Sequence, residues 1–188
     1  MKKTYIKFLT ACAAGLLLLT ACNRNAEAVL FEDKSTVKKA DKSAWTATAD
    51  SETPDGWENT GKASATIDGD INTYWHTNYE SGNNPDYPHW ILIDMKEGQN
   101  MVAVDITNRQ AGGAGNTVGM KRFKLEGSND GSAFTSLGEF NFAISNGAQS
   151  FPVSSEAAYR YLKVTALEPQ RAGTRHTFLA EIDVFVVK

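Results

Sequence analysis

Short runs of residues that alternate between apolar and polar side chains recur from Trp45 to the end of the chain. In Tyr161–Val164, and again in Ile182–Phe185, one face of the run is apolar. A period of two over about four to eight residues is typical of a strand with one buried face. The runs that we interpret as strands cover residues 45–49, 90–95, 101–107, 121–126, 134–140, 159–166 and 180–187.

Polar turn clusters separate these runs, among them GSNDGS at 127–132 and QAGGAGNT at 110–117. Such clusters favour turns because Gly, Asn, Asp and Ser adopt the backbone conformations that turns require. No segment after the N-terminal region carries an apolar stripe with helical spacing. Roughly seven or eight short strands with polar turns predict an all-β fold, a β-sandwich of the jelly-roll type.

The N-terminus has a different pattern. Lys2, Lys3 and Lys7 accompany an apolar run of 14 residues at 8–21, which is shorter than the roughly 20 residues that a membrane-spanning helix needs. These features are typical of a signal peptide. The residues Leu19–Cys22 (LTAC) resemble the lipobox of bacterial lipoproteins, which implies cleavage before Cys22 and lipidation of its thiol. The alternative is an ordinary secretory signal followed by an incidental cysteine.

This interpretation divides the chain into three parts. Residues 1–21 form the signal peptide, residues 22–43 form the lipidated Cys22 with a polar tether, and residues 44–188 form one domain. We expect a lipid-anchored extracytoplasmic protein of the cell envelope, held at the outer membrane.

Cysteine content and charge exclude several classes of site. Cys12 leaves with the signal and Cys22 carries lipid, so the folded part has no disulfide, no thiolate metal site and no cysteine nucleophile. The chain has 19 basic and 22 acidic residues, and loss of three lysines with the signal leaves the mature chain at −6. Nucleic acid is therefore not an expected partner, since its phosphates need basic patches.

The segment ATIDGDINTYWHT at 65–77 places oxygen-bearing side chains close together, at Asp68, Asp70, Asn72 and Thr73. Oxygen donors on a tight loop suit Ca²⁺. The segment is not an EF-hand, because Thr73 and Tyr79 stand where that loop needs glycine and an acid. The alternative to a metal site is an Asx-type turn between two strands.

Six motifs together carry a resemblance to a known family: IDGDINTYWHT (67–77), YPHWILIDM (87–95), NRQAGGAGN (108–116), FKLEGSNDGSAF (123–134), YRYLKV (159–164) and AEIDVF (180–185). From residue 45 onward the chain resembles the discoidin family, also called the coagulation factor 5/8 type C domain. Bacterial members include carbohydrate-binding module family 32. The resemblance implies a β-sandwich jelly roll with ligands bound by loops at one end.

The resemblance also implies a structural calcium site that ties the C-terminal strand to the first loop. Its side-chain ligands would be Asp68, Asp70, Thr73 and Glu181, and the carbonyls of Ala65, Thr73 and Ala180 would complete the coordination. Crowded carboxylates repel each other unless a cation neutralises them, which agrees with this assignment.

A sugar site is implied at three positions that match galactose-binding members: His76, Arg109 and Asn116. Arginine donates hydrogen bonds in a planar fork, asparagine both donates and accepts, and histidine orients one hydroxyl. The alternatives are that His76 is a satisfied histidine that binds nothing and that Arg109 is structural at a strand end.

The aromatic surface that a sugar ring needs would come from Tyr79 or Phe178, with Trp57 as a remoter candidate. We expect Trp75 and Trp90 in the core. His89 and His176 are expected to be structural or surface residues.

No catalytic motif accompanies these features: the sequence has no G-x-S-x-G elbow, no H-E-x-x-H and no phosphate loop. The sequence predicts a non-catalytic lipoprotein that binds a galactose-type glycan. The second candidate is a protein-interaction module in an envelope complex. Phospholipid binding fits poorly, because no loop carries paired aromatic residues flanked by lysines.

Overall fold

The computed structural model of the chain describes residues 36–187, except 58–60, 81, 83, 111–116 and 156. The predicted signal peptide, Cys22, most of the tether and Asn116 therefore lie outside the described residues. None of the described helices is long and apolar enough to cross a membrane.

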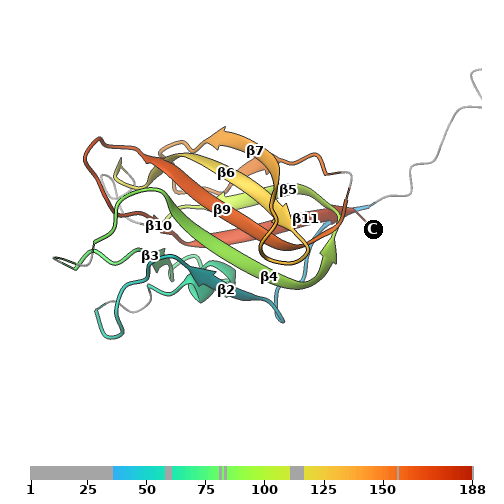
Figure 1. Ribbon diagram of the computed structural model, residues 1–188, viewed down its shortest axis with the longest axis horizontal. Coiled ribbons are helices and arrows are strands. Elements are labelled where there is room, and N and C mark those ends of the chain that lie inside the picture. The colour runs from blue at the N-terminus through green and yellow to red at the C-terminus, as the bar shows by residue number, and fades with distance from the viewer. Residues whose placement is uncertain are drawn as a thin grey trace, which may run out of the picture. The chain divides into compact units, whose positions relative to one another are not determined.

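Antiparallel strands build the domain (Figure 1). A four-stranded sheet has the order β1-β11-β5-β8, a five-stranded sheet has the order β2-β4-β9-β6-β7, and a small ladder joins β10 to β3. One short 3-10 helix, η2 (Ala63–Ile67), precedes β3. The strands are β1 (Val37–Lys39), β2 (Thr46–Ala49), β3 (Trp75–His76), β4 (His89–Gln99), β5 (Met101–Thr107), β6 (Met120–Ser128), β7 (Thr135–Asn141), β8 (Gln149–Pro152), β9 (Tyr159–Pro169), β10 (Phe178–Leu179) and β11 (Glu181–Val187).

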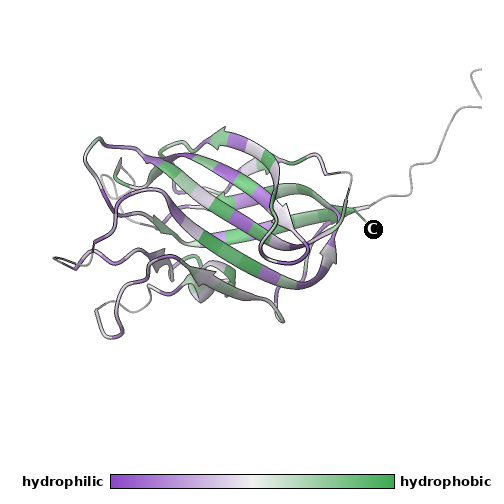
Figure 2. Cartoon of the chain, in the orientation of Figure 1, coloured by the Kyte–Doolittle hydropathy of each residue, from purple (hydrophilic) through white to green (hydrophobic). Residues whose placement is uncertain are grey.

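The core lies between the two larger sheets. Alternate side chains of β4, β6 and β9 are buried. Figure 2 shows the apolar (green) stretches along these strands. Successive side chains of a strand point to opposite faces, so each strand contributes every second residue to the core. The predicted β-sandwich is confirmed. Its fully buried residues include Ile91, Ile93, Val104, Ile106, Leu162 and Ile182.

The two tryptophans expected in the core have different environments. Trp75 is 1% exposed and packs in the core. Trp90 lies instead on the outer face of β4, half-buried, with the Lys163 ammonium 5.2 Å from its ring centroid. Its neighbours His89 and Ile91 point inward, and the strand period turns Trp90 outward. The core assignment of Trp90 was therefore wrong.

The folded part begins earlier than residue 44. Strand β1, which lies in the segment assigned to the tether, pairs with β11 from Val37 opposite Val187 to Lys39 opposite Phe185. Ala40 is buried, and its N–H donates to the Val184 carbonyl over 2.8 Å. The structure thus places residues 36–43 on the domain.

Candidate functional site

A two-residue ladder sets the position of the candidate sugar site. Strand β3 pairs with β10, with His76 opposite Phe178 and Trp75 opposite Leu179. Trp75 fixes β3 in place, because its indole Nε1 donates to the Ser51 carbonyl over 2.8 Å. The ladder brings together the loop that follows β3 and the segment that precedes β10, which are far apart in sequence.

An aromatic cluster forms around His76. Its ring stacks on Tyr79 with centroids 4.7 Å apart, and it meets His176 and Phe178 edge-on at 5.5 and 5.6 Å. Trp57 in turn meets Tyr79 edge-on at 5.5 Å. The cluster thus extends from the β3–β10 ladder outward to the loop that carries Trp57.

Exposure divides this cluster into an open part and a buried part. Trp57 is 48% exposed and Tyr79 is 36% exposed, whereas His76 and Phe178 are 6% and 2% exposed. A methyl group at Gly119 would lie 3.3 Å from the Phe178 ring, so that glycine lets the chain pass close above it. Of the two expected platform residues, Tyr79 presents an open face and Phe178 does not; Trp57 supplies the second open ring.

Arg109 lies beside the same cluster, two residues after β5 ends. Its guanidinium carbon lies 4.3 Å from the centroid of Tyr74 and 5.6 Å from that of Phe178. No carboxylate among the described residues pairs with this guanidinium. The structure therefore brings His76 and Arg109 together around Phe178. Sequence reasoning missed Tyr74. It lies two residues before His76, and residues two apart in an extended segment point to the same side, so this spacing could have indicated it.

The two remaining histidines have different roles. His89 is fully buried, with Nδ1 2.9 Å from Asp50 Oδ2 and Nε2 2.6 Å from the Arg175 carbonyl oxygen. Through its contact with the Arg175 carbonyl, His89 joins the 171–177 loop to β4, as expected for a structural histidine. His176 is half-buried at the edge of the site, and burial lowers its pKa, with further lowering by the charges of Arg171 and His89.

The Asp68 loop is organised by its own side chains. The Asp70 N–H donates to Asp68 Oδ1 over 2.8 Å, and the Asn72 N–H donates to Asp70 Oδ1 over 2.9 Å. These are Asx turns, the alternative that the sequence left open. The Thr73 hydroxyl donates to Asp68 Oδ2 over 2.6 Å.

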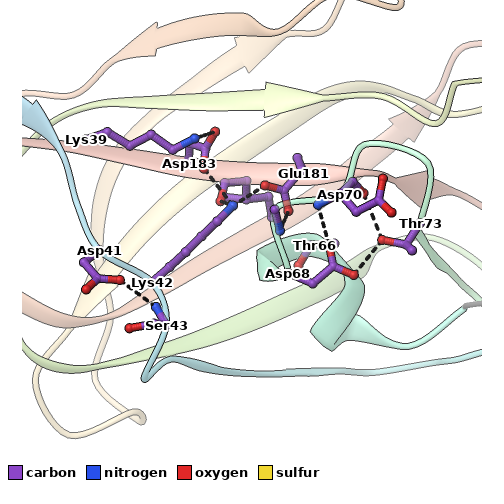
Figure 3. A network of polar contacts seen from close by, with 12 residues as sticks. Lys39, Asp41, Lys42, Ser43, Thr66, Asp68, Asp70, Thr73, Glu181 and Asp183 are labelled. Atoms are coloured by element: carbon purple, nitrogen blue, oxygen red, sulfur yellow. Dashed lines mark hydrogen bonds and ion pairs between the residues drawn. The ribbon is translucent and has the colours of Figure 1, made fainter.

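Glu181 joins this loop to the N-terminal segment (Figure 3). The Gly69 N–H donates to Glu181 Oε1 over 3.2 Å, and the Lys42 ammonium donates to Glu181 Oε2. Lys42 also contacts Asp183 at 2.7 Å, and Lys39 contacts the other oxygen of Asp183 at 2.6 Å. The side chains of Lys42 and Glu181 are only 12% and 5% exposed.

Opposing effects act on the two carboxylates of this network. Burial raises the pKa of Glu181, against the hydrogen bond and charge of Lys42. Burial also acts to raise the pKa of Asp183, but hydrogen bonds from Lys39 and Lys42 outweigh it and the pKa is lowered. Lys42 is the residue that sequence reasoning missed here, because it lies in the segment assigned to the tether.

The residues expected to hold calcium do lie around one loop. Asp68 and Thr73 touch, Glu181 contacts Gly69, and Ala65 and Ala180 lie in η2 and directly before β11. All of their donor atoms are oxygens, the ligand type that calcium takes. Within the described residues no three Asp, Glu, His or Cys side chains are grouped as a metal site, so calcium would also depend on the Thr73 hydroxyl and the backbone carbonyls.

These features define a class of domain: a β-sandwich with a cluster of aromatic and cationic side chains in loops at one end. The model of the F5/8 type C domain family matches residues 46–182. The chain therefore belongs to the F5/8 type C domain family.

Solved structures of family members share the fold. The family 32 carbohydrate-binding module of C. perfringens NanJ, in complex with galactose, is 25% identical with a TM-score of 0.66 and covers 80% of this chain and 99% of its own. CpGH89CBM32-5 from Clostridium perfringens, in complex with GalNAc-β-1,3-galactose, is 27% identical with a TM-score of 0.69 and covers 79% of this chain and 100% of its own.

Curated relatives are much longer proteins. A galactose oxidase from Gibberella zeae is 29% identical over 143 residues, which are 75% of this chain and 20% of the relative. A sialidase from Micromonospora viridifaciens is 26% identical over 124 residues, which are 66% of this chain and 18% of the relative. The chain thus spans about a fifth of the length of these enzymes.

Proposed function

We propose that this domain is a carbohydrate-binding module that holds a terminal galactose-type sugar at its loop end and does not act on it chemically. The observation that carries the proposal is the exposed Trp57–Tyr79 pair beside His76 and an Arg109 that no described carboxylate neutralises. Family members with similar folds were solved with galactose and with GalNAc-β-1,3-galactose, which supports the same ligand class for this chain.

Each part of the site suits one side of a sugar. The open rings of Trp57 and Tyr79 can cover the C–H face of a pyranose, since aromatic rings bury apolar area well. The Arg109 guanidinium offers several donors to ring hydroxyls, and the Tyr74 ring below holds it in place. His76 fixes the position of Tyr79 by stacking and lies at the inner edge of the same surface.

Two carboxylates near this surface are engaged in structural contacts. Asp50 contacts His89 at 2.9 Å, and Asp86 pairs with Arg175 at 2.6 Å. Hydrolysis of a glycosidic bond needs two carboxyl groups across a cleft. This supports a binding role over a catalytic one, although the longer relatives are enzymes that contain such a domain as one part.

We also propose a calcium ion at the Asp68 loop, held by Asp68, Asp70, Thr73 and Glu181 with the carbonyls of Ala65, Thr73 and Ala180. Bound there, calcium would neutralise the crowded carboxylates and fix the loop that leads into β3. The charge of Lys42 at Glu181 supplies part of that neutralisation already. Attachment to the envelope through a lipid on Cys22 belongs to the same proposal and is supported by the sequence at 19–22.

A glycan array probed with residues 36–188, with and without calcium, tests the binding function. We expect galactose-terminated glycans to bind, and Arg109→Ala to weaken them by about 1.5–3 kcal/mol in titration calorimetry, the usual worth of a hydrogen bond to a charged group. His76→Ala serves as a second variant within the cluster. A wild-type domain that binds no glycan would favour the protein-interaction function instead.

Thermal unfolding in calcium and in chelator tests the metal site. A ligand at about 100 times its Kd stabilises the folded state by about 2.7 kcal/mol, so the melting temperature should rise by several degrees in calcium. Asp68→Asn should reduce that rise. Equal melting temperatures in protein shown to be metal-free at the start would contradict the site.

Membrane fractionation of a Cys22→Ser variant tests the anchor. Two or three acyl chains hold a protein durably, because burial contributes about 0.8 kcal/mol per CH₂ group. We expect the variant to leave the membrane fraction, and a variant that stays there would place the anchor elsewhere.

A further inference from the structure

A second pocket borders the proposed sugar site. It has a volume of about 280 Å³ and is lined by Asn84 and by the loop from Arg171 to His176. His176 belongs to both places, because its ring also meets His76 edge-on at 5.5 Å. His176 therefore lies between the aromatic cluster and this pocket.

The pocket carries a positive charge that no described carboxylate neutralises. Arg175 pairs with Asp86 at 2.6 Å, whereas no carboxylate among the described residues pairs with the exposed Arg171. The chain as a whole has a formal net charge of −3, so this cationic spot differs in sign from the rest of the molecule. A guanidinium offers paired donors that match carboxylate and sulfate oxygens.

Two residues that line the pocket also have a buried side-chain atom without a partner. Asn84 Oδ1 and Thr174 Oγ1 are buried, and neither has a hydrogen-bond partner among the described residues. Leaving such groups unpaired costs free energy, so each unpaired atom calls for an explanation, and a missing ligand is one. An amide oxygen accepts from a hydroxyl and a threonine hydroxyl can donate, so the pair suits a polyhydroxylated ligand.

The loop that forms the pocket is fixed to the sheet. The Arg175 carbonyl lies 2.6 Å from His89 Nε2, the Thr177 N–H donates to Thr77 Oγ1 over 3.0 Å, and the Thr174 N–H donates to the Arg171 carbonyl over 3.1 Å. Gly173 closes the turn with φ = 80°, a conformation that favours glycine. A loop held in this way loses little conformational freedom when a ligand binds.

We propose that this pocket binds the negatively charged group of an acidic sugar that adjoins the terminal sugar held at Arg109 and the Trp57–Tyr79 surface. The inference rests on the proposed function and extends it from neutral galactosides to anionic ones. Arg171 contacts the anionic group, carboxylate or sulfate, while Asn84 and Thr174 meet hydroxyls of the same sugar.

Titration of three probes tests the pocket: lactose, lactobionate (galactose joined to a gluconate carboxylate) and sulfated lactose. We expect the wild-type domain to bind one anionic probe about threefold to fivefold more tightly than lactose, the upper range for a partly exposed ion pair. That preference should shrink at high ionic strength. If lactobionate binds more tightly, the pocket prefers a carboxylate; if sulfated lactose binds more tightly, it prefers a sulfate.

Arg171→Gln should remove the preference and leave the affinity for lactose unchanged. The matched control is Arg160→Gln, because Arg160 is already paired with Asp94 on the outer face of the sheet. Arg109→Ala should weaken all three probes together, which separates failure of this pocket from failure of the sugar site. Equal binding of the three probes by wild type, or a preference that survives in Arg171→Gln, overturns the inference; binding of no probe overturns the proposed function as well.

Discussion

The arginines on the outer face of the five-stranded sheet differ from those at the loop end. Arg160 contacts both oxygens of Asp94 at 2.9 Å, and Arg122 contacts Glu168 at 2.7 Å and Glu139 at 2.8 Å. The hydrogen bonds from Arg160 hold the pKa of Asp94 well below its usual range. At the loop end, Arg109 and Arg171 have no such partner among the described residues.

Two tryptophans outside the core differ in the same way. The half-buried Trp90 on the sheet has the Lys163 ammonium 5.2 Å from its ring centroid, whereas Trp57 in the loops contacts Tyr79 and is 48% exposed. On the sheet the charges and rings already satisfy one another, so they contribute to stability. At the loop end Arg175 is paired with Asp86. Arg109, Arg171 and the Trp57 ring are left available there, so we expect changes at these three residues to act on binding.

The largest effect should come from the buried charges. Lys42→Met leaves the buried Glu181 without its cation, while Asp183 keeps Lys39, and we expect a cost of about 3–5 kcal/mol of unfolding free energy in chelator. Lys39→Met is the control, since Lys39 is 52% exposed and its ion pair should contribute less than about 1 kcal/mol. Urea unfolding measures the stability of both variants. Similar unfolding midpoints for the two would contradict the expectation that the buried ion pair stabilises the fold more than the exposed one.

A second test compares the tryptophan in the loops with the half-buried tryptophan on the sheet. Trp57→Ala should weaken glycan binding by about tenfold or more, because a tryptophan at the centre of a binding surface often carries over 1.4 kcal/mol. Trp90→Ala should leave glycan affinity unchanged. Titration calorimetry on a galactose-terminated probe measures both, and equal losses would show that the open surface is not confined to the loops.

The paired arginine on the sheet should have a smaller effect. Arg160→Ala removes an ion pair that is partly exposed, so we expect a loss of about 0.2–1 kcal/mol in stability. Its glycan affinity should match that of wild type. A loss of glycan binding in this variant, with the fold intact by circular dichroism, would contradict the expectation that the arginines on the sheet act on stability alone.

The smallest effect concerns pH. Burial lowers the pKa of His176 below its ordinary value of 6.5. Between the lowered value and 6.5 the unfolded chain binds the proton more readily than the folded one, so stability should fall as pH drops below 6.5 and level off below the folded pKa. Melting temperatures across this range should fall less in His176→Asn than in wild type; identical curves would assign the acid sensitivity to other groups.

The local sequence pattern was sufficient to predict where the strands lie. It was insufficient to predict, for some residues, whether the side chain faces the core or the solvent. Alternation in Ile182–Phe185 predicts which residues of β11 face the core, and burial follows that pattern. The run from Trp90 to Ile93 is apolar at every position, so its pattern does not say which face is inside. The pattern alone therefore could not show that Trp90 faces outward.

Contacts between distant segments account for what sequence reasoning missed. The two-residue ladder of β3 and β10 brings His176 to His76, and its shortness leaves no pattern to detect. Lys42 reaches Glu181 only because β1 pairs with β11. Conversely, the Asp68 loop was found from sequence because its residues are neighbours in the chain.

The pairing of β1 with β11 also determines at which end of the domain the chain enters. Val37 lies opposite Val187, while the other end of β11, Glu181, lies opposite Thr107, close to Arg109 and the recognition loops. A strand of this length spans about 20 Å. The chain therefore enters the domain at the pole opposite its loops, as Figure 1 shows. If several copies of the domain are displayed together, as the proposed anchor would allow, weak individual sites can act together on a multivalent target.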